Sequence, residues 1–255
     1  MSNYDRNAGA RWGTSVGQAT GTQVDQGLRS YMLGVYNYMT LGLAITGVFA
    51  LGLKMVGTVE TESGRLALTQ IGQVMYRGPL HWVIMLAPLA FVLFFSFRID
   101  RMSAASARNM FFAFSAVMGL SLSTILLVYT GNSVARAFFV TAGAFGGLSL
   151  YGYTTKRDLS PIGSFLVMGL IGLILASLVN VFLQSSAFQF GLSVLSILIF
   201  AGLTAWDTQA IKEMYFANDD YETATKKSVN GALMLYLDFI NIFQSVLSLT
   251  GSRND

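Results

Sequence analysis

Seven long apolar stretches follow one another along this 255-residue chain, and each is about long enough to cross a lipid bilayer. Only 11% of the residues are charged, and most of them lie between the stretches. Because backbone amides in hydrocarbon must be hydrogen-bonded internally, such stretches are expected to form transmembrane helices. The pattern therefore predicts an all-α integral membrane protein with seven spans. These cover residues 31–53, 79–97, 109–129, 134–154, 161–183, 189–210 and 230–249.

The N-terminal segment differs from the rest of the chain. Residues 1–28 are polar and rich in Gly, Thr and Gln, which is typical of disorder. They lack the basic-then-apolar pattern of a signal peptide, so the first span is expected to direct insertion. We expect a disordered cytoplasmic tail over 1–28 and a seven-helix domain over 29–250.

Lys and Arg divide unequally between the two sides of the membrane. With the N-terminus inside, eleven lie on the inner side and five on the outer side, which favours an inner N-terminus and an outer C-terminus. The inner set is Arg6, Arg11, Arg29, Arg98, Arg101, Arg108, Lys156, Arg157, Lys212, Lys226 and Lys227. The outer set is Lys54, Arg65, Arg77, Arg136 and Arg253.

The last stretch, from Asn230 to Leu249, carries a carboxylate near its middle, Asp238. Asn241, Ser245 and Ser248 follow at spacings of three, four and three residues, so a helix places them on the face of Asp238. A charge inside a span is costly and rarely faces lipid. We therefore expect Asp238 to point into the bundle or into a water-filled cavity.

A second acid, Asp207, lies near the inner end of the sixth span. Spans six and seven run antiparallel, and at about 1.5 Å per residue both acids fall in the inner half of the bilayer. If the two carboxyl groups meet, both cannot ionise cheaply, so the pair is expected to share a proton. The deprotonated pair would offer oxygen ligands to calcium. Further polar lining is expected from Thr204, Thr208, Asn241 and Ser245.

Structural interpretations of the two acids stay open. Asp207 is close enough to the interface to pair with Lys212, and Asp238 could hydrogen-bond to a neighbouring helix. Arg98 and Arg101, at the inner end of the second span, have a suitable depth to pair with either acid. They could equally be interfacial anchors of that span.

Several function classes lack the residues that they need. The chain has no Cys and one His, so it lacks the metal ligands of a metalloprotease and the nucleophile of a cysteine enzyme. No basic run suggests nucleic acid, and the last span has no Lys for a retinal. We expect no enzymatic activity and no resident cofactor.

Two motifs carry a family resemblance. FAGLTAWDTQAIKEMY (Phe200 to Tyr215), followed by ALMLYLDFINIFQSVL (Ala232 to Leu247), resembles the Bax inhibitor-1 family, also called the transmembrane Bax inhibitor motif family. Its hallmarks are an aspartate in each motif, present here as Asp207 and Asp238. The similarity covers the seven-span layout, and the specific motifs lie in the last quarter of the chain.

The resemblance implies a bundle with the last helix at its centre and a pH-sensitive calcium leak. The paired aspartates would be the proton sensor and the ion path. In the closed form an arginine of the second helix, here Arg98 or Arg101, would pair with one of them. Eukaryotic members are associated with suppression of cell death, and some bacterial relatives modulate a membrane-anchored protease. The short N-terminus and compact loops look like the bacterial branch, which implies the cytoplasmic (inner) membrane.

Our leading prediction is a calcium leak channel gated by the buried pair, with low pH inside protonating the pair and weakening its arginine partner. The alternative is a membrane-embedded regulator that binds a membrane protease or another complex without conducting ions. Proton-coupled transport of a small solute is a third option, for which no substrate pocket is evident in the sequence.

Overall fold

A computed structural model describes residues 13–61 and 66–254 of the chain. In this part, six helices are long and apolar enough to cross a membrane, and a bent pair makes a seventh crossing when it is counted as one span. The expected all-α membrane class is therefore confirmed. The helices are α1 (Gly13–Gly57), α2 (Gln70–Tyr76), α3 (Leu80–Arg98), the short 3-10 helix η1 (Ile99–Arg101), α4 (Ala104–Leu122), α5 (Ile125–Val128), α6 (Gly131–Thr154), α7 (Ser160–Leu183), α8 (Ser186–Glu213) and α9 (Tyr221–Thr250).

Two details of the second and third spans differ from the simple helices that the sequence predicts. The second expected span is α3, and α2 precedes it at an angle of 54°. The third is interrupted at Ser123 and Thr124, between α4 and α5. A short antiparallel hairpin of β1 (Thr58–Glu60) and β2 (Leu66–Leu68) lies between α1 and α2 and was not expected.

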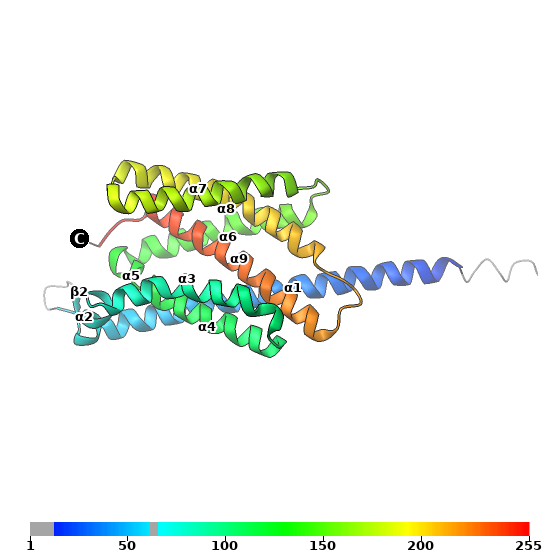
Figure 1. Cartoon of the computed structure of the whole chain (residues 1–255), viewed down its shortest axis with the longest axis horizontal. Helices are drawn as coiled ribbons and strands as arrows, with labels where there is room; N and C mark the ends of the chain where they lie inside the picture. The colour runs from blue at the N-terminus through cyan, green and yellow to red at the C-terminus, as the bar shows by residue number, and fades with distance from the viewer. Residues whose placement is uncertain (1–12, 62–65, 255) are drawn as a thin grey trace, which may run out of the picture.

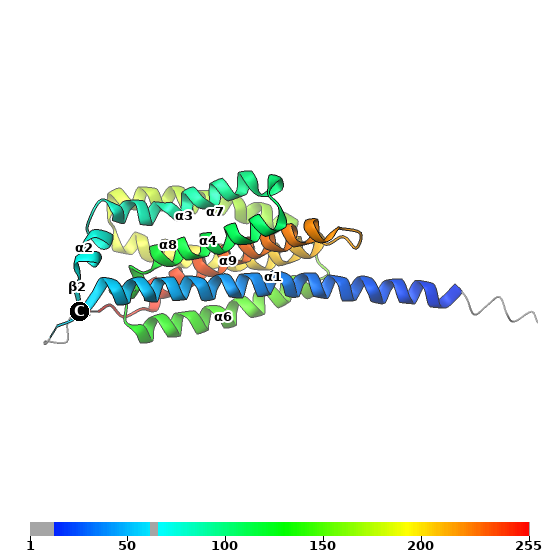
Figure 2. The same ribbon diagram turned by 90° about the horizontal axis from the view of Figure 1, so that it is seen from below.

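The helix α1 extends well before its membrane-spanning part. Residues 13–28, which we expected to be disordered, are helical, whereas residues 1–12 of that expected tail lie outside the described residues. Once the apolar span has fixed the helix, each added residue contributes one more backbone hydrogen bond. No proline interrupts this stretch of the sequence. Figure 2 shows the resulting blue segment of α1 projecting beyond the other helices.

The helix α9 passes diagonally through the middle of the bundle (Figure 1). Helices α6, α7 and α8 lie on one side of it, and α1, α3 and α4 lie on the other. The most apolar window of α9 is 61% buried, against 6% for α7. The predicted central position of the last helix is therefore confirmed.

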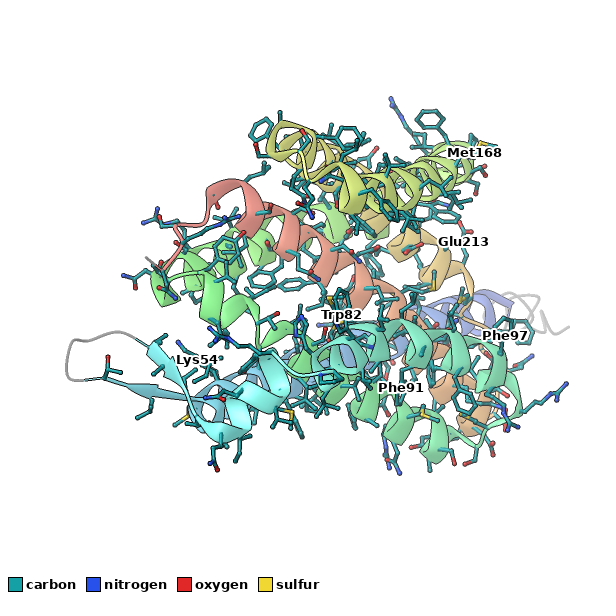
Figure 3. All side chains as sticks on the ribbon, turned by 60° about the vertical axis from the view of Figure 1, so that its left-hand side comes forward. Lys54, Trp82, Phe91, Phe97, Met168 and Glu213 are labelled. Carbon is teal, nitrogen blue, oxygen red and sulfur yellow. The ribbon has the colours of Figure 1, made fainter. Side chains whose placement is uncertain are left out.

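The outer surface of the bundle is apolar, as lipid contact requires. Phe97 on α3 and Met168 on α7 project from it in Figure 3, with exposed fractions of 81% and 71%. Inside, the ring of Tyr236 on α9 packs edge-on against Phe111 and Phe114 of α4, with centroids 5.7 Å apart in both pairs. These contacts hold α9 against α4.

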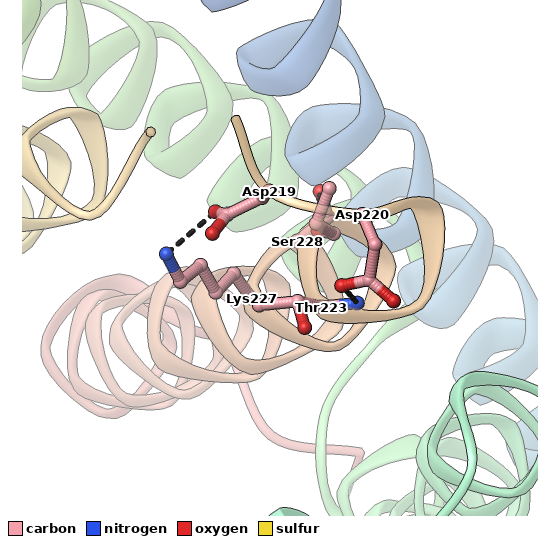
Figure 4. Close-up of polar contacts among 6 residues, drawn as sticks. Asp219, Asp220, Thr223, Lys227 and Ser228 are labelled. Atoms are coloured by element: carbon pink, nitrogen blue, oxygen red, sulfur yellow. Dashed lines mark hydrogen bonds and ion pairs between the residues drawn. The ribbon is translucent and has the colours of Figure 1, made fainter. Parts of the chain in front are cut away.

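The connection between α8 and α9 sets the register of the two helices. Asp220 caps α9 by accepting a hydrogen bond from the Thr223 backbone N–H at 3.2 Å, and Lys227 pairs with Asp219 at 2.6 Å (Figure 4). Hydrogen bonding to Thr223 lowers the pKa of the Asp220 carboxyl. The short, capped turn places the end of α8 beside the first turns of α9.

Candidate functional site

Asp207 on α8 and Asp238 on α9 meet inside the bundle. Their side chains are in hydrogen-bonding contact, and the residues are only 7% and 4% exposed. The helices that carry them pack side by side along much of their length. The structure therefore joins the two acids that the sequence placed at compatible depths.

The motif around Asp207 shows why this acid faces inward. Thr208 bonds to the Thr204 carbonyl oxygen at 2.7 Å, and its hydroxyl lies 2.9 Å from that of Ser149 on α6. Gln209 accepts a hydrogen bond from the Leu159 N–H at 2.8 Å and thereby fixes the α6–α7 turn. These neighbours attach α8 to α6 and α7, which leaves Asp207 turned toward α9.

One oxygen of the pair has no hydrogen-bond partner in the described part of the chain. The Oδ2 atom of Asp238 is buried and accepts no hydrogen bond from the described residues. A buried carboxylate oxygen without a partner is costly. This atom is therefore available to a proton, a water molecule or a cation.

A polar cavity of about 470 Å³ lies beyond Asp238, toward the C-terminal end of α9. Asn241 and Ser245, on the same helix face as Asp238, line it. The Ser245 hydroxyl donates to that of Ser196 on α8 at 2.8 Å. The polar residues of its lining are Ser177, Gln189, Ser193, Ser196, Asn241, Gln244, Ser245 and Ser248.

On the other side of the pair, toward the α8–α9 turn, the two helices are tightly packed. Ile211 and Leu235 are fully buried. A Cβ atom added to Gly231 would lie only 2.9 Å from Ile211, so the backbone of α9 approaches this side chain closely. The lining of the polar cavity thus comes within one helical turn of Asp238 from one end of the bundle, and apolar side chains pack tightly at the other.

Comparison with known proteins decides the family. Residues 28–255 match the family model described as inhibitor of apoptosis-promoting Bax1. The chain belongs to the Bax inhibitor-1 family. The inner membrane protein YbhL of Escherichia coli K12 is 43% identical over 89% of this chain and 93% of its own length. An uncharacterised protein of Rickettsia prowazekii is 46% identical over 91% and 93% of the two chains, and an uncharacterised membrane protein of Streptococcus pyogenes is 34% identical over 92% and 97%.

The arginine contact that the resemblance to the Bax inhibitor-1 family implies for the closed form is absent from the described residues. Arg98 is exposed and lies over the ring of Phe94, 5.6 Å from its centroid. Arg101 is also exposed, and the described residues include no ion pair between either arginine and Asp207 or Asp238. Arg98 is the last residue of α3 and Arg101 is the last residue of η1, a position at which cationic side chains commonly anchor a membrane helix.

The other expected partner of Asp207 is also engaged elsewhere. Lys212 donates to the Tyr153 carbonyl oxygen at 2.9 Å and lies over the ring of Tyr153. The ion pair between Lys212 and Asp207 that the sequence left open is therefore not formed. No described cationic side chain forms an ion pair with either acid of this Bax inhibitor-1 protein.

The predicted polar lining is divided. Asn241 and Ser245 line the cavity, whereas Thr204 and Thr208 are fully buried away from it. Thr204 donates to the Phe200 carbonyl oxygen at 2.7 Å, so its hydroxyl is satisfied within α8. Threonine hydroxyls in membrane helices commonly bond back to the preceding turn in this way.

Sequence reasoning did not single out the α8 side of the cavity. Gln189, Ser193 and Ser196 supply it. Their spacings of four and three residues continue, through Phe200 and Leu203, to Asp207. This spacing of three and four residues places Gln189, Ser193 and Ser196 on the helix face of Asp207, just as Asn241 and Ser245 share a helix face with Asp238. The sequence therefore contained a signal that could have identified them.

Proposed function

We propose that this protein is a pH-sensitive calcium leak channel whose gate is the carboxyl pair of Asp207 and Asp238. The single observation that carries the proposal is the buried Oδ2 atom of Asp238, which has no hydrogen-bond partner among the described residues and lies about one helical turn from Asn241 of the polar cavity. A hard cation prefers oxygen ligands of this kind. Asn241 and Ser245 are the neutral oxygen donors on its route.

The proposed gate consists of the carboxyl pair alone, because neither Arg98 nor Arg101 pairs with it. With one shared proton, the two carboxyl groups hydrogen-bond and hold α8 against α9. Loss of that proton leaves two negative charges in contact in a low dielectric, which favours separation of the helices. The same loss creates the ligand for a cation. Separation would loosen the packing of Ile211 and Leu235 that closes the far end, so flux should rise with pH.

Calcium influx into proteoliposomes, measured across a pH series, tests the proposal. Asp207→Asn and Asp238→Asn should both remove most of the pH dependence, because neither variant has two ionisable groups to share a proton. Asp158→Asn is the matched control, since Asp158 is an exposed loop carboxylate far from the pair in the sequence. Variants of the pair that conduct and respond to pH like the parent would exclude the pair as the gate.

A regulator of a membrane protease is the second candidate function. The observation that favours it is the part of α1 before Gln26, which continues as helix beyond the membrane-spanning part and offers a surface to a partner. Removal of residues 1–28 separates the two functions. A leak channel should keep its flux, whereas a regulator should lose capture of a membrane-anchored protease. Correctly inserted protein that shows no flux at any pH would favour the regulator.

We also propose an inner-membrane location with the N-terminus inside and the C-terminus outside. The excess of Lys and Arg on one side supports the orientation. The relative YbhL is named an inner membrane protein, which supports a location in that membrane. The chain has no cysteine, so a single one can be introduced at Ser2 or Ser252. Labelling of intact cells with an impermeant maleimide should modify only the Ser252→Cys protein.

A further inference from the structure

A second cavity lies on the membrane-facing side of the bundle, away from the carboxyl pair. It is a groove of about 800 Å³ between α1 and α6. Met32, Met39 and Leu43 of α1 and Phe138 and Phe145 of α6 form much of its wall. These apolar walls suit a hydrocarbon chain better than a soluble metabolite.

The groove has a cationic end. Arg29 lines it at the end where α1 enters the bundle and α6 leaves it. Lys212 lies over the ring of Tyr153, another lining residue at this end. The lining contains no carboxylate, and no described acidic side chain pairs with Arg29. The site therefore combines positive charge at one end with an apolar channel.

The length of the groove fits one leaflet. Arg29 and Leu43 are fourteen residues apart on α1, which corresponds to about 21 Å of helix. Half of a bilayer's hydrocarbon core is about 15 Å thick. A chain that runs from Leu43 toward Arg29 would therefore reach the headgroup region near the guanidinium.

The floor of the groove connects to the helix of the carboxyl pair. The Tyr36 hydroxyl lies 2.7 Å from that of Ser149, which in turn lies 2.9 Å from that of Thr208. Tyr36 and Ser149 both line the groove, and Thr208 is the residue after Asp207. An occupant of the groove would thus contact the hydroxyl groups that fix α8.

We propose that this groove binds one anionic phospholipid, with its phosphate at Arg29 and one acyl chain between α1 and α6. The positive end selects the headgroup charge, and the apolar walls select a lipid over a free phosphate. Anionic headgroups gain about fivefold in affinity from one nearby Lys or Arg. The site is independent of ion conduction, so its test does not rest on flux.

The experiment is native mass spectrometry of the full-length protein in detergent with equal amounts of dioleoylphosphatidylglycerol and dioleoylphosphatidylcholine. The first bound lipid should be phosphatidylglycerol, and Arg29→Gln should weaken it about fivefold. Arg136→Gln is the matched control, because Arg136 is an exposed arginine at the opposite end of α6.

Two glycines of α6 provide a steric test. A Cβ atom added at Gly146, which lines the groove, or at Gly147, which does not, would have no neighbour within 4 Å. Gly146→Phe should fill the groove and abolish the first lipid adduct, and Gly147→Phe should leave it unchanged. Gly146→Leu, with a smaller side chain, should weaken the adduct, and melting curves check that each variant is folded.

Each of the following results would overturn the proposal. The first is equal binding of the two lipids in the parent, which would indicate ordinary annular lipid. The second is equal loss in Arg29→Gln and Arg136→Gln, or a lipid adduct that persists in folded Gly146→Phe. The third is competition by soluble glycerol phosphate at the same concentration as the lipid, which would indicate a site for a free phosphate.

Discussion

Asp207 of α8 and Asp238 of α9 touch through their carboxyl groups, and the Oδ2 atom of Asp238 is buried without a partner among the described residues. The contact lies three residues along α9 from Asn241, which lines a polar cavity that both helices form. It is therefore the place where a proton and a cation would compete for the same oxygen. The proposed leak activity depends on that competition.

Asn241 should control passage to the pair, because it is the polar lining residue on α9 nearest to Asp238. If the proposed leak exists, Asn241→Leu should lower calcium influx severalfold, since it removes an oxygen from the cavity while both acids remain. The pH at half-maximal flux should stay near that of the parent. Thr250→Val, at an exposed site near the end of α9, is the control. Unaltered flux in Asn241→Leu would argue against this route.

Thr46 should stabilise the fold through a buried hydrogen bond. Its hydroxyl lies 2.6 Å from that of Tyr236 and can donate to the carbonyl oxygen of Gly42 or Ser115, each 2.9 Å away. Thr46→Val should reduce the free energy of unfolding by about 1–3 kcal/mol, because the Tyr236 hydroxyl loses a buried partner. Thr46→Val/Tyr236→Phe should recover part of this loss. Additive losses in the double-mutant cycle would mean that the two hydroxyl groups are not coupled.

Close approach of α6 and α8 should make Gly152 intolerant of a side chain. A Cβ atom there would collide with the Ala205 carbonyl oxygen, two residues before Asp207. Gly152→Ala should lower stability by about 1–3 kcal/mol, as overpacking does. Gly143→Ala on the same helix meets open space and should be neutral or stabilising. Melting temperatures in detergent distinguish the two, and equal values would contradict the packing.

The Asp220 cap should give a defined pH dependence of stability. Hydrogen bonds from Thr223 lower the folded-state pKa of this carboxyl, so its stabilising effect is present above the unfolded pKa. This stabilising effect is lost as the pH falls through the folded-state pKa of Asp220. Asp220→Ala should therefore melt below the parent at neutral pH, with the gap closing in acid.

Asp220→Asn separates the charge from the hydrogen bond of this cap. Asparagine caps helices nearly as well as aspartate, so this variant should keep most of the melting temperature and lose the acid transition. A gap between Asp220→Ala and the parent that persists unchanged at low pH would contradict an ionised cap.

The sequence by itself determined the class of the fold and the two acids at its centre. Long uncharged stretches can only become membrane helices, because lipid satisfies no backbone amide. Asp238 had to face inward because a charged side chain in contact with lipid is costly. Its helical spacing to Asn241 and Ser245 also predicted two of the residues that line the cavity.

Tertiary structure decided the features that depend on two helices at once. Arg98 and Arg101 had a suitable depth for a contact with the acids, but depth does not specify direction, and both are exposed instead, with Arg98 over the ring of Phe94. Thr204 and Thr208 share a helix with Asp207, yet their hydroxyl groups bond to the backbone. The groove between α1 and α6 joins residues more than a hundred positions apart in the chain. Periodicity along one helix carries no information on such pairs, because they arise only when the helices pack.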